Sequence, residues 1–80
     1  MTKTINWTDF SDEMPKENDW YLFAMEGSIP MLGYLFIDEL KDGTKLYCFE
    51  YYRGNTKCAM YFDEKDYHGL YAWVLDKDLF

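Results

Sequence analysis

The sequence predicts a small, mainly β domain, a five-stranded antiparallel meander that is strongly curled. One short helical turn near the N-terminus would make it α+β. Three observations predict this fold. Aromatic residues, which favour strands, make up 21% of the chain. Asp-Gly and Gly-Asn pairs, typical of hairpin turns, separate apolar runs. Phenylalanine recurs every thirteen residues, close to the spacing of a strand plus a turn, at Phe10, Phe23, Phe36, Phe49 and Phe62.

The elements follow from this pattern in order along one domain of 80 residues, 1–80. The first nineteen residues are the least regular: they leave room for a short strand near residues 5–7 and a helical turn at 11–15, which Pro15 would limit. The five expected strands then come between turn signals and a polar loop at 63–69. They cover residues 20–25, 31–37, 45–52, 57–62 and 70–75.

Two-residue loops at Gly27-Ser28, Asp42-Gly43 and Gly54-Asn55 would fix the register of the sheet. In that register the triplet Tyr-Leu-Phe, which occurs at 21–23 and 34–36, has the same phase in both strands. The tyrosine and phenylalanine side chains of both triplets would then share one face, with Phe36 opposite Phe49.

The other face of the expected sheet also carries many apolar residues, among them Trp20, Leu35 and Leu46. A sheet that is apolar on both faces must curl, be covered, or bind something. We expect the N-terminal segment, with Trp7 and Phe10, to cover one side.

The expected register also bears on the two cysteines, Cys48 and Cys58. It places them on opposite faces of the sheet, where their Cβ vectors point apart. A disulfide cannot bridge that geometry, so both are expected to be free thiols.

The net charge of −7 restricts the class of partner. It argues against direct binding of nucleic acid, whose affinity comes from Lys and Arg on phosphates, and against anionic membranes. A basic protein is the natural complement, although acidity also keeps an aromatic-rich protein in solution. Because no apolar run approaches a membrane span and no signal-peptide pattern occurs, we expect a cytoplasmic protein.

A meander brings alternate turns to the same end of the sheet, and most of the acidic residues fall in the turns of one end. We call the acids of that end the acidic rim and expect it to bind a partner, with two exposed tyrosines as anchors. The expected partner-binding residues are Asp12, Glu13, Asp38, Glu39, Asp42, Asp63, Glu64 and Asp66 of the rim, and the anchors Tyr52 and Tyr67.

The residues that could carry chemistry are few and scattered. His68 is the single histidine, and Cys48 and Cys58 lack the spacing of a zinc or redox site. A Cys58–His68 nucleophile and base would have no third partner. The acids between residues 63 and 66 do not follow a calcium-loop pattern. The sequence therefore predicts no catalytic residue, metal or cofactor, and a protein that is not an enzyme.

The stretch WTDFSDEMP from Trp7 to Pro15, followed by the triplet at 21–23 and a late Ala72-Trp73, resembles short phage and prophage domains of unknown function. Their pattern is W-x6-[LM]-P, a strand, and a closing Trp. The chain departs from it after Trp73, where those domains tend to have Pro. The resemblance implies a phage origin, and small acidic phage proteins often inhibit host machinery, as anti-CRISPR and anti-restriction proteins do.

Together these expectations describe a phage-type binding protein in the host bacterial cytoplasm. It would inhibit a nucleic-acid-handling defence complex by covering a basic surface with the acidic rim. The alternative is a structural or assembly module that forms a homodimer through an apolar sheet face.

Overall fold

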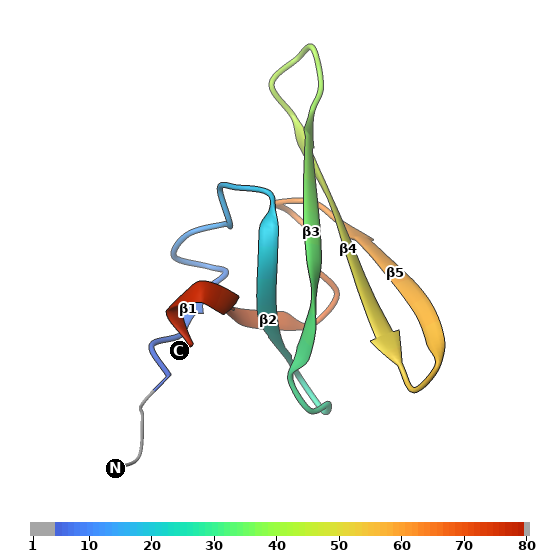
Figure 1. Cartoon of the computed structure of the whole chain (residues 1–80). Coiled ribbons are helices and arrows are strands. Elements are labelled where there is room, and N and C mark those ends of the chain that lie inside the picture. The colour runs from blue at the N-terminus through green and yellow to red at the C-terminus, as the bar shows by residue number, and fades with distance from the viewer. Residues whose placement is uncertain (1–4, 80) are drawn as a thin grey trace.

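The computed structural model describes residues 5–79 and shows one open sheet of six antiparallel strands (Figure 1). The single helical piece in this range is a short 3-10 helix, η1, at Asp76–Asp78. The order of strands across the sheet is β1-β6-β2-β3-β4-β5. Their bounds are β1 Thr8–Asp9, β2 Asp19–Met25, β3 Met31–Glu39, β4 Lys45–Arg53, β5 Thr56–Phe62 and β6 Leu70–Leu75.

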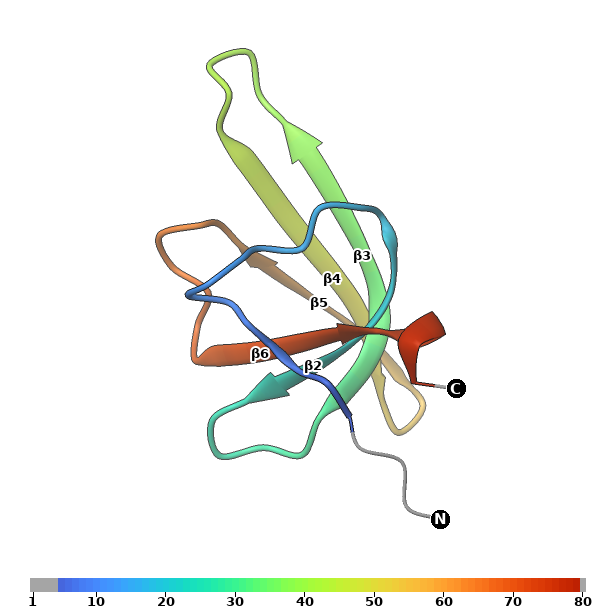
Figure 2. The ribbon, with the colours of Figure 1, turned by 90° about the vertical axis from the view of Figure 1, so that its left-hand side faces the viewer.

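The predicted mainly β class is confirmed, and each of the five expected strands lies within two residues of its expected bounds. The topology differs in two ways. β6 pairs with β2, whereas a meander would pair it with β5, and the short β1 adds a sixth strand beyond β6. The sheet is also neither closed nor strongly curled, contrary to expectation. The 63–69 loop carries the chain from β5 across one face of the sheet to the side of β2, where β6 pairs (Figure 2).

Residues 5–18 contain no α-helix. The expected strand near residues 5–7 lies instead at Thr8–Asp9, paired with Trp73 and Ala72 of β6. The expected helical turn is a hydrogen-bonded turn, in which the N–H groups of Asp12 and Glu13 both donate to the Asp9 carbonyl.

The register of β3 is one residue away from the expected one, and this reverses its two faces. Leu35, not Phe36, lies opposite Phe49 on β4, and Phe23 on β2 lies opposite Met31. Side chains alternate along a strand, so a shift of one residue moves each of them to the other face.

The cause is loop length. The Leu40 N–H bonds to the Thr44 carbonyl at 2.7 Å, and Gly43 adopts a φ of 89°. Asp42-Gly43 therefore belongs to a three-residue loop, with glycine in the left-handed position, instead of the two-residue loop expected. At Gly54 the expected two-residue loop is confirmed, with Arg53 opposite Thr56.

The two Tyr-Leu-Phe triplets consequently point in opposite directions. Tyr21 and Phe23 are fully buried, whereas in the second triplet Leu35 is buried and Phe36 is exposed. We call the face that carries Phe23 the core face and the opposite one the outer face. The rings of Phe23 and Phe49 stack at the centre of the core face, 4.0 Å apart.

Segments 10–18 and 63–69 cover the core face from the same side (Figure 2). The Phe10 ring meets Phe23 edge-on at 5.2 Å and stacks on Tyr67 at 5.5 Å. The N-terminal cover is thus confirmed for Phe10, while Trp7 stays partly exposed.

Hydrogen bonds hold segment 10–18 in place. Trp73 Nε1 donates to the Glu13 carbonyl at 2.9 Å, and the Tyr21 hydroxyl donates to the Glu17 carbonyl at 2.7 Å. Burial raises the pKa of Tyr21 to about 12. The late tryptophan of the sequence pattern therefore ties the two ends of the described chain together.

The cysteines lie as expected. Cys48 is opposite Tyr61 on the outer face, and Cys58 is opposite Tyr51 on the core-face side, so they point to different faces of the sheet. Both are free thiols. Within residues 5–79, no helix has the length and apolar character needed to cross a bilayer.

Candidate functional site

The outer face carries a patch of large apolar side chains that nothing in residues 5–79 covers. Isolated exposed apolar residues are normal, but a contiguous patch marks a binding surface. Leu32 and Phe36 of β3 lie on this face because the register of β3 is one residue away from the expected one. The patch consists of six residues that are each at least 43% exposed: Trp20, Leu32, Phe36, Leu46, Tyr52 and Tyr61.

An aromatic row forms one side of the patch. The Trp20 ring meets Tyr34 edge-on at 5.4 Å, and Tyr34 lies 4.9 Å from Phe36. Such rings present a large contact area with few rotatable bonds, which makes aromatic residues frequent anchors of protein interfaces.

A shallow hollow of about 430 Å³ lies beside this row. Phe36, Leu46, Cys48 and Tyr61 form its apolar lining, and Asp38 is also part of the lining. Asp38 lies directly opposite Leu46 in the β3–β4 ladder. The Cys48 sulfur beside Tyr61 raises the pKa of the Tyr61 phenol. The hollow therefore combines apolar walls with one carboxylate.

The charges on the outer face are mostly negative. Glu50 pairs with Lys57 at 3.4 Å. The Asp38 carboxylate has no hydrogen bond or ion pair with another residue in the described part of the chain. A cation approaching the hollow would therefore meet an uncompensated carboxylate.

The acidic rim is partly assembled and partly neutralised. Asp42 from the β3–β4 loop and Asp63 and Glu64 from the 63–69 loop line one open hollow of about 340 Å³. Lys45 and Lys65 line the same hollow, and Glu13 is paired with Lys16 at 2.7 Å. The loops at this end do lie together, but cations are interspersed among the acids.

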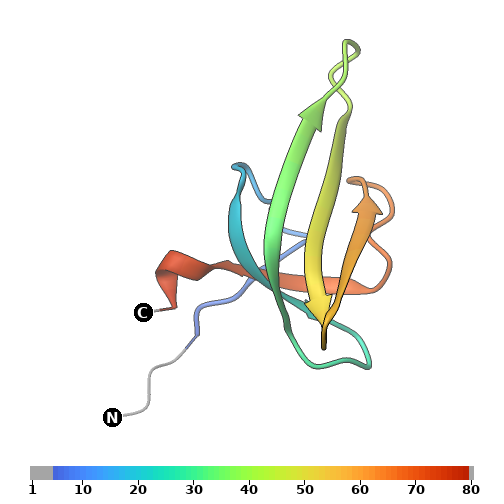
Figure 3. The ribbon, with the colours of Figure 1, turned by 45° about the vertical axis from the view of Figure 1, so that its right-hand side comes forward.

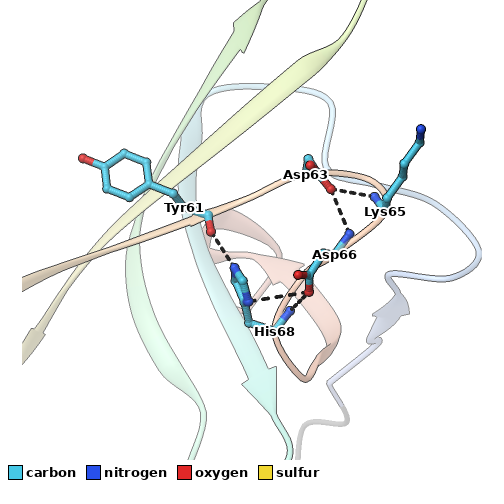
Figure 4. Close-up of polar contacts among 5 residues, drawn as sticks. All are labelled: Tyr61, Asp63, Lys65, Asp66 and His68. Carbon is cyan, nitrogen blue, oxygen red and sulfur yellow. Dashed lines mark hydrogen bonds and ion pairs between the residues drawn. The ribbon is translucent and has the colours of Figure 1, made fainter.

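Several rim carboxylates hold their own loops. Asp63 Oδ1 accepts hydrogen bonds from the N–H groups of Lys65 and Asp66, both at 2.8 Å (Figure 4). These two bonds, that from Asp66 foremost, lower the pKa of Asp63. Asp42 likewise accepts from the Thr44 N–H, which lowers the pKa of Asp42. These aspartates shape turns, so replacing them would alter the loops as well as the charge.

The remaining rim acids are available to a partner. Their carboxylates make no hydrogen bond or ion pair with other residues in the range 5–79; they are Asp12, Asp38, Glu39 and Glu64.

The two tyrosines expected as anchors, Tyr52 and Tyr67, differ in their exposure. Tyr67 stacks on Phe10 and is half-buried, so its expected exposure was wrong, because the loop that carries it folds over the core. Tyr52 is 66% exposed and belongs to the outer-face patch. It lies next to the β4–β5 turn, at the end of the sheet away from the acidic rim.

The titratable groups considered for chemistry are not brought together. His68 Nε2 donates to the Tyr61 carbonyl at 2.9 Å and its Nδ1 lies 3.5 Å from Asp66 (Figure 4). The Cys58 sulfur contacts the Thr56 carbonyl at 3.8 Å. Among residues 5–79, no group of three His, Cys, Asp or Glu side chains is placed to hold a metal ion.

No family model, curated protein or solved structure matches this chain. The resemblance to short phage and prophage domains therefore stays a prediction, and the functional argument depends on the two surfaces described above.

Sequence reasoning missed the outer-face patch as it stands because the expected register placed Phe36 on the other face. A signal was present in Lys41-Asp42-Gly43, which fits a three-residue hairpin loop with glycine at its third position.

Proposed function

We propose that this protein is a non-enzymatic protein-binding domain, that the outer-face patch is its contact surface, and that its partner is a basic protein. The observation that supports this most directly is the hollow beside the aromatic row. Apolar walls from Phe36, Leu46 and Tyr61 surround a site that also contains the uncompensated Asp38.

This arrangement suits an arginine or lysine side chain. The aliphatic stem packs on apolar surface, and the charged end reaches a carboxylate or lies over a ring. The net charge of −7 also steers a positively charged protein toward the domain and raises the rate of association. A second copy of this chain fits less well, because face-to-face contact would bring Asp38 and Glu50 of both copies into one interface.

The finer proposal is that the partner belongs to a nucleic-acid-handling defence complex of a bacterial host. The domain would then act in the host cytoplasm as a phage-encoded inhibitor of the anti-CRISPR type. Binding would occlude a surface that is basic because it contacts phosphates. The free carboxylates of Asp12, Asp38, Glu39 and Glu64 support it, as does the resemblance to short phage domains.

A capture experiment separates the outer face from the acidic rim. The native chain and two variants are immobilised and exposed to nuclease-treated bacterial lysate at low and high salt, and captured proteins are identified by mass spectrometry. The outer-face variant is Phe36→Ser with Leu46→Ser. The rim variant is Asp12→Asn, Glu39→Gln and Glu64→Gln, which spares the aspartates that hold loops. Tyr71→Ser, at an aromatic residue of β6 that is 54% exposed and outside the patch, is the control.

We expect the native chain to capture a basic protein and the outer-face variant to lose about tenfold or more in affinity, as truncated interface anchors do. The rim variant should lose less and mainly at low salt, because exposed charges act over a short screened range. The opposite ranking would assign binding to the acidic rim. Recovery of the bait alone, as a salt-resistant dimer that the outer-face variant does not form, would favour a homodimer through the outer face.

A further inference from the structure

β5 is an edge strand of the sheet and pairs only with β4 among the described residues (Figure 3). In an antiparallel ladder, hydrogen-bonded and non-hydrogen-bonded pairs alternate. The two-residue loop makes Arg53–Thr56 the closing, hydrogen-bonded pair. The N–H and C=O groups of Lys57, Ala59 and Tyr61 therefore point away from β4, toward the free edge.

The contact of His68 confirms this direction and shortens the free edge. His68 Nε2 donates to the Tyr61 carbonyl, which is one of the outward groups. Lys57 and Ala59 keep both of their backbone groups exposed. These two residues flank Cys58 symmetrically, so the uncapped part of the edge is self-complementary.

We propose that two copies of this chain pair through their β5 edges, antiparallel, about a two-fold axis at Cys58. The backbone groups of Lys57 would bond to Ala59 of the second copy, and those of Ala59 to Lys57 of the second copy. This inference uses a different surface from the proposed outer-face contact and goes beyond it. Because the two-fold pairing uses the β5 edge of both copies, assembly through this edge stops at two.

The charges near the edge favour a second copy. β5 has one charged side chain, Lys57, and its ammonium is paired with Glu50 of its own chain at 3.4 Å. An antiparallel arrangement sets the acidic loops of the two copies at opposite ends of the paired strands. It also places Arg53, beside the β4–β5 turn, near the acidic 63–69 loop of the second copy. The acidic loops of the two copies thus lie far apart, which limits the repulsion between two chains that each carry a net charge of −7.

The pairing buries little apolar area, so we expect a weak dimer that forms at high protein concentration. It also makes a specific prediction about the thiols. Residues directly opposite in a non-hydrogen-bonded pair have Cβ atoms about 4.5–5.5 Å apart. Cys58 would face Cys58 of the second copy at nearly the distance that a disulfide needs. Cys48, on the outer face of β4, would have no such neighbour.

Single-thiol variants test this prediction. Cys48→Ser leaves Cys58 as the one thiol, and Cys58→Ser leaves Cys48. Diamide oxidises two thiols to a disulfide by accepting two electrons and two protons, and the dimer is measured on non-reducing gels. We expect the Cys48→Ser chain to form the disulfide dimer at least about tenfold faster than the Cys58→Ser chain. Equal rates, or no dimer from either, would overturn the proposal.

A backbone variant tests the hydrogen bonds themselves. Ala59→Pro, in the Cys48→Ser chain, removes an N–H that points away from β4, a position where an edge strand tolerates proline. We expect at least a tenfold slower formation of the disulfide dimer. In the native chain, the amide NMR signals of Lys57 and Ala59 should shift with protein concentration, whereas that of Met60, bonded to β4, should not. Fixed signals at millimolar concentration would contradict edge pairing.

The tests of edge pairing give a result that does not depend on the proposed function. The outer-face variant Phe36→Ser with Leu46→Ser, combined with Cys48→Ser, should form the disulfide dimer as fast as Cys48→Ser alone. If it does, loss of partner capture and loss of edge pairing are separate results.

Discussion

Replacing Phe23 with alanine is expected to lower the free energy of unfolding by about 3–5 kcal/mol, the usual cost of a large cavity in a core. The same substitution at Phe36 is expected to cost less than about 1 kcal/mol. Both residues end a Tyr-Leu-Phe triplet, but Phe23 is fully buried and stacked on Phe49, while Phe36 is 44% exposed on the outer face. The pair therefore compares the same residue in the same local sequence.

Urea unfolding of the three proteins, followed by circular dichroism, measures both values. A domain of 80 residues has a total stability of about 4–12 kcal/mol, so Phe23→Ala should lose a large share of it and Phe36→Ala almost none. Equal losses would contradict the reversed phase of β3.

Gly33→Ala is expected to destabilise the fold by about 3 kcal/mol or more, through overpacking of a rigid site. A Cβ atom at this position would lie 2.3 Å from the Glu50 carbonyl oxygen and 2.8 Å from the Phe49 ring. The nearest obstacle is backbone of the neighbouring strand, which cannot move without breaking the β3–β4 ladder.

Gly54→Ala is the matched control. Gly54 has a φ of 64°, and nothing lies within 4 Å of an added Cβ. Its cost is therefore that of placing a side chain in the left-handed region, about 1–2 kcal/mol. Thermal unfolding ranks the two variants. If Gly33→Ala were the more stable of the pair, β3 would not pack its backbone against Phe49 as described.

The positions of the strands could be read from the sequence because aromatic and aliphatic runs alternate with strong turn residues. Their register could not, because Asp42-Gly43 fits loops of two or three residues and the two choices differ by one residue. That difference decided which face Phe36 occupies. The partner of β6 was also out of reach, since pairing β6 with β2 depends on how the 63–69 loop crosses the core.

The candidate site was predicted unevenly for related reasons. Charge can be counted from sequence, so the gathering of Asp42, Asp63 and Glu64 at one end was foreseen. Hydrogen bonds cannot be counted in this way, and Asp63 proved to hold its own loop. The outer-face patch follows from the register, so it became visible only once the phase of β3 was known.

The proposed function depends on which face of the sheet each β3 side chain occupies. The three-residue loop at Gly43 turns Phe36 outward and Leu35 inward. The core is still filled, because Leu35 packs with Phe23 and Phe49. The outer face gains an aromatic row and a hollow, which a fold selected for stability alone would have no reason to expose.

The most direct measurement of the central claim is photo-crosslinking in nuclease-treated bacterial lysate. Benzoylphenylalanine replaces Phe36 in one protein and Tyr71 in another; both positions are aromatic and exposed, but only Phe36 lies on the outer-face patch. We predict that position 36 crosslinks to a basic protein and that position 71 does not. Crosslinks of equal yield from both positions, or none from position 36, would contradict a contact surface on the outer face.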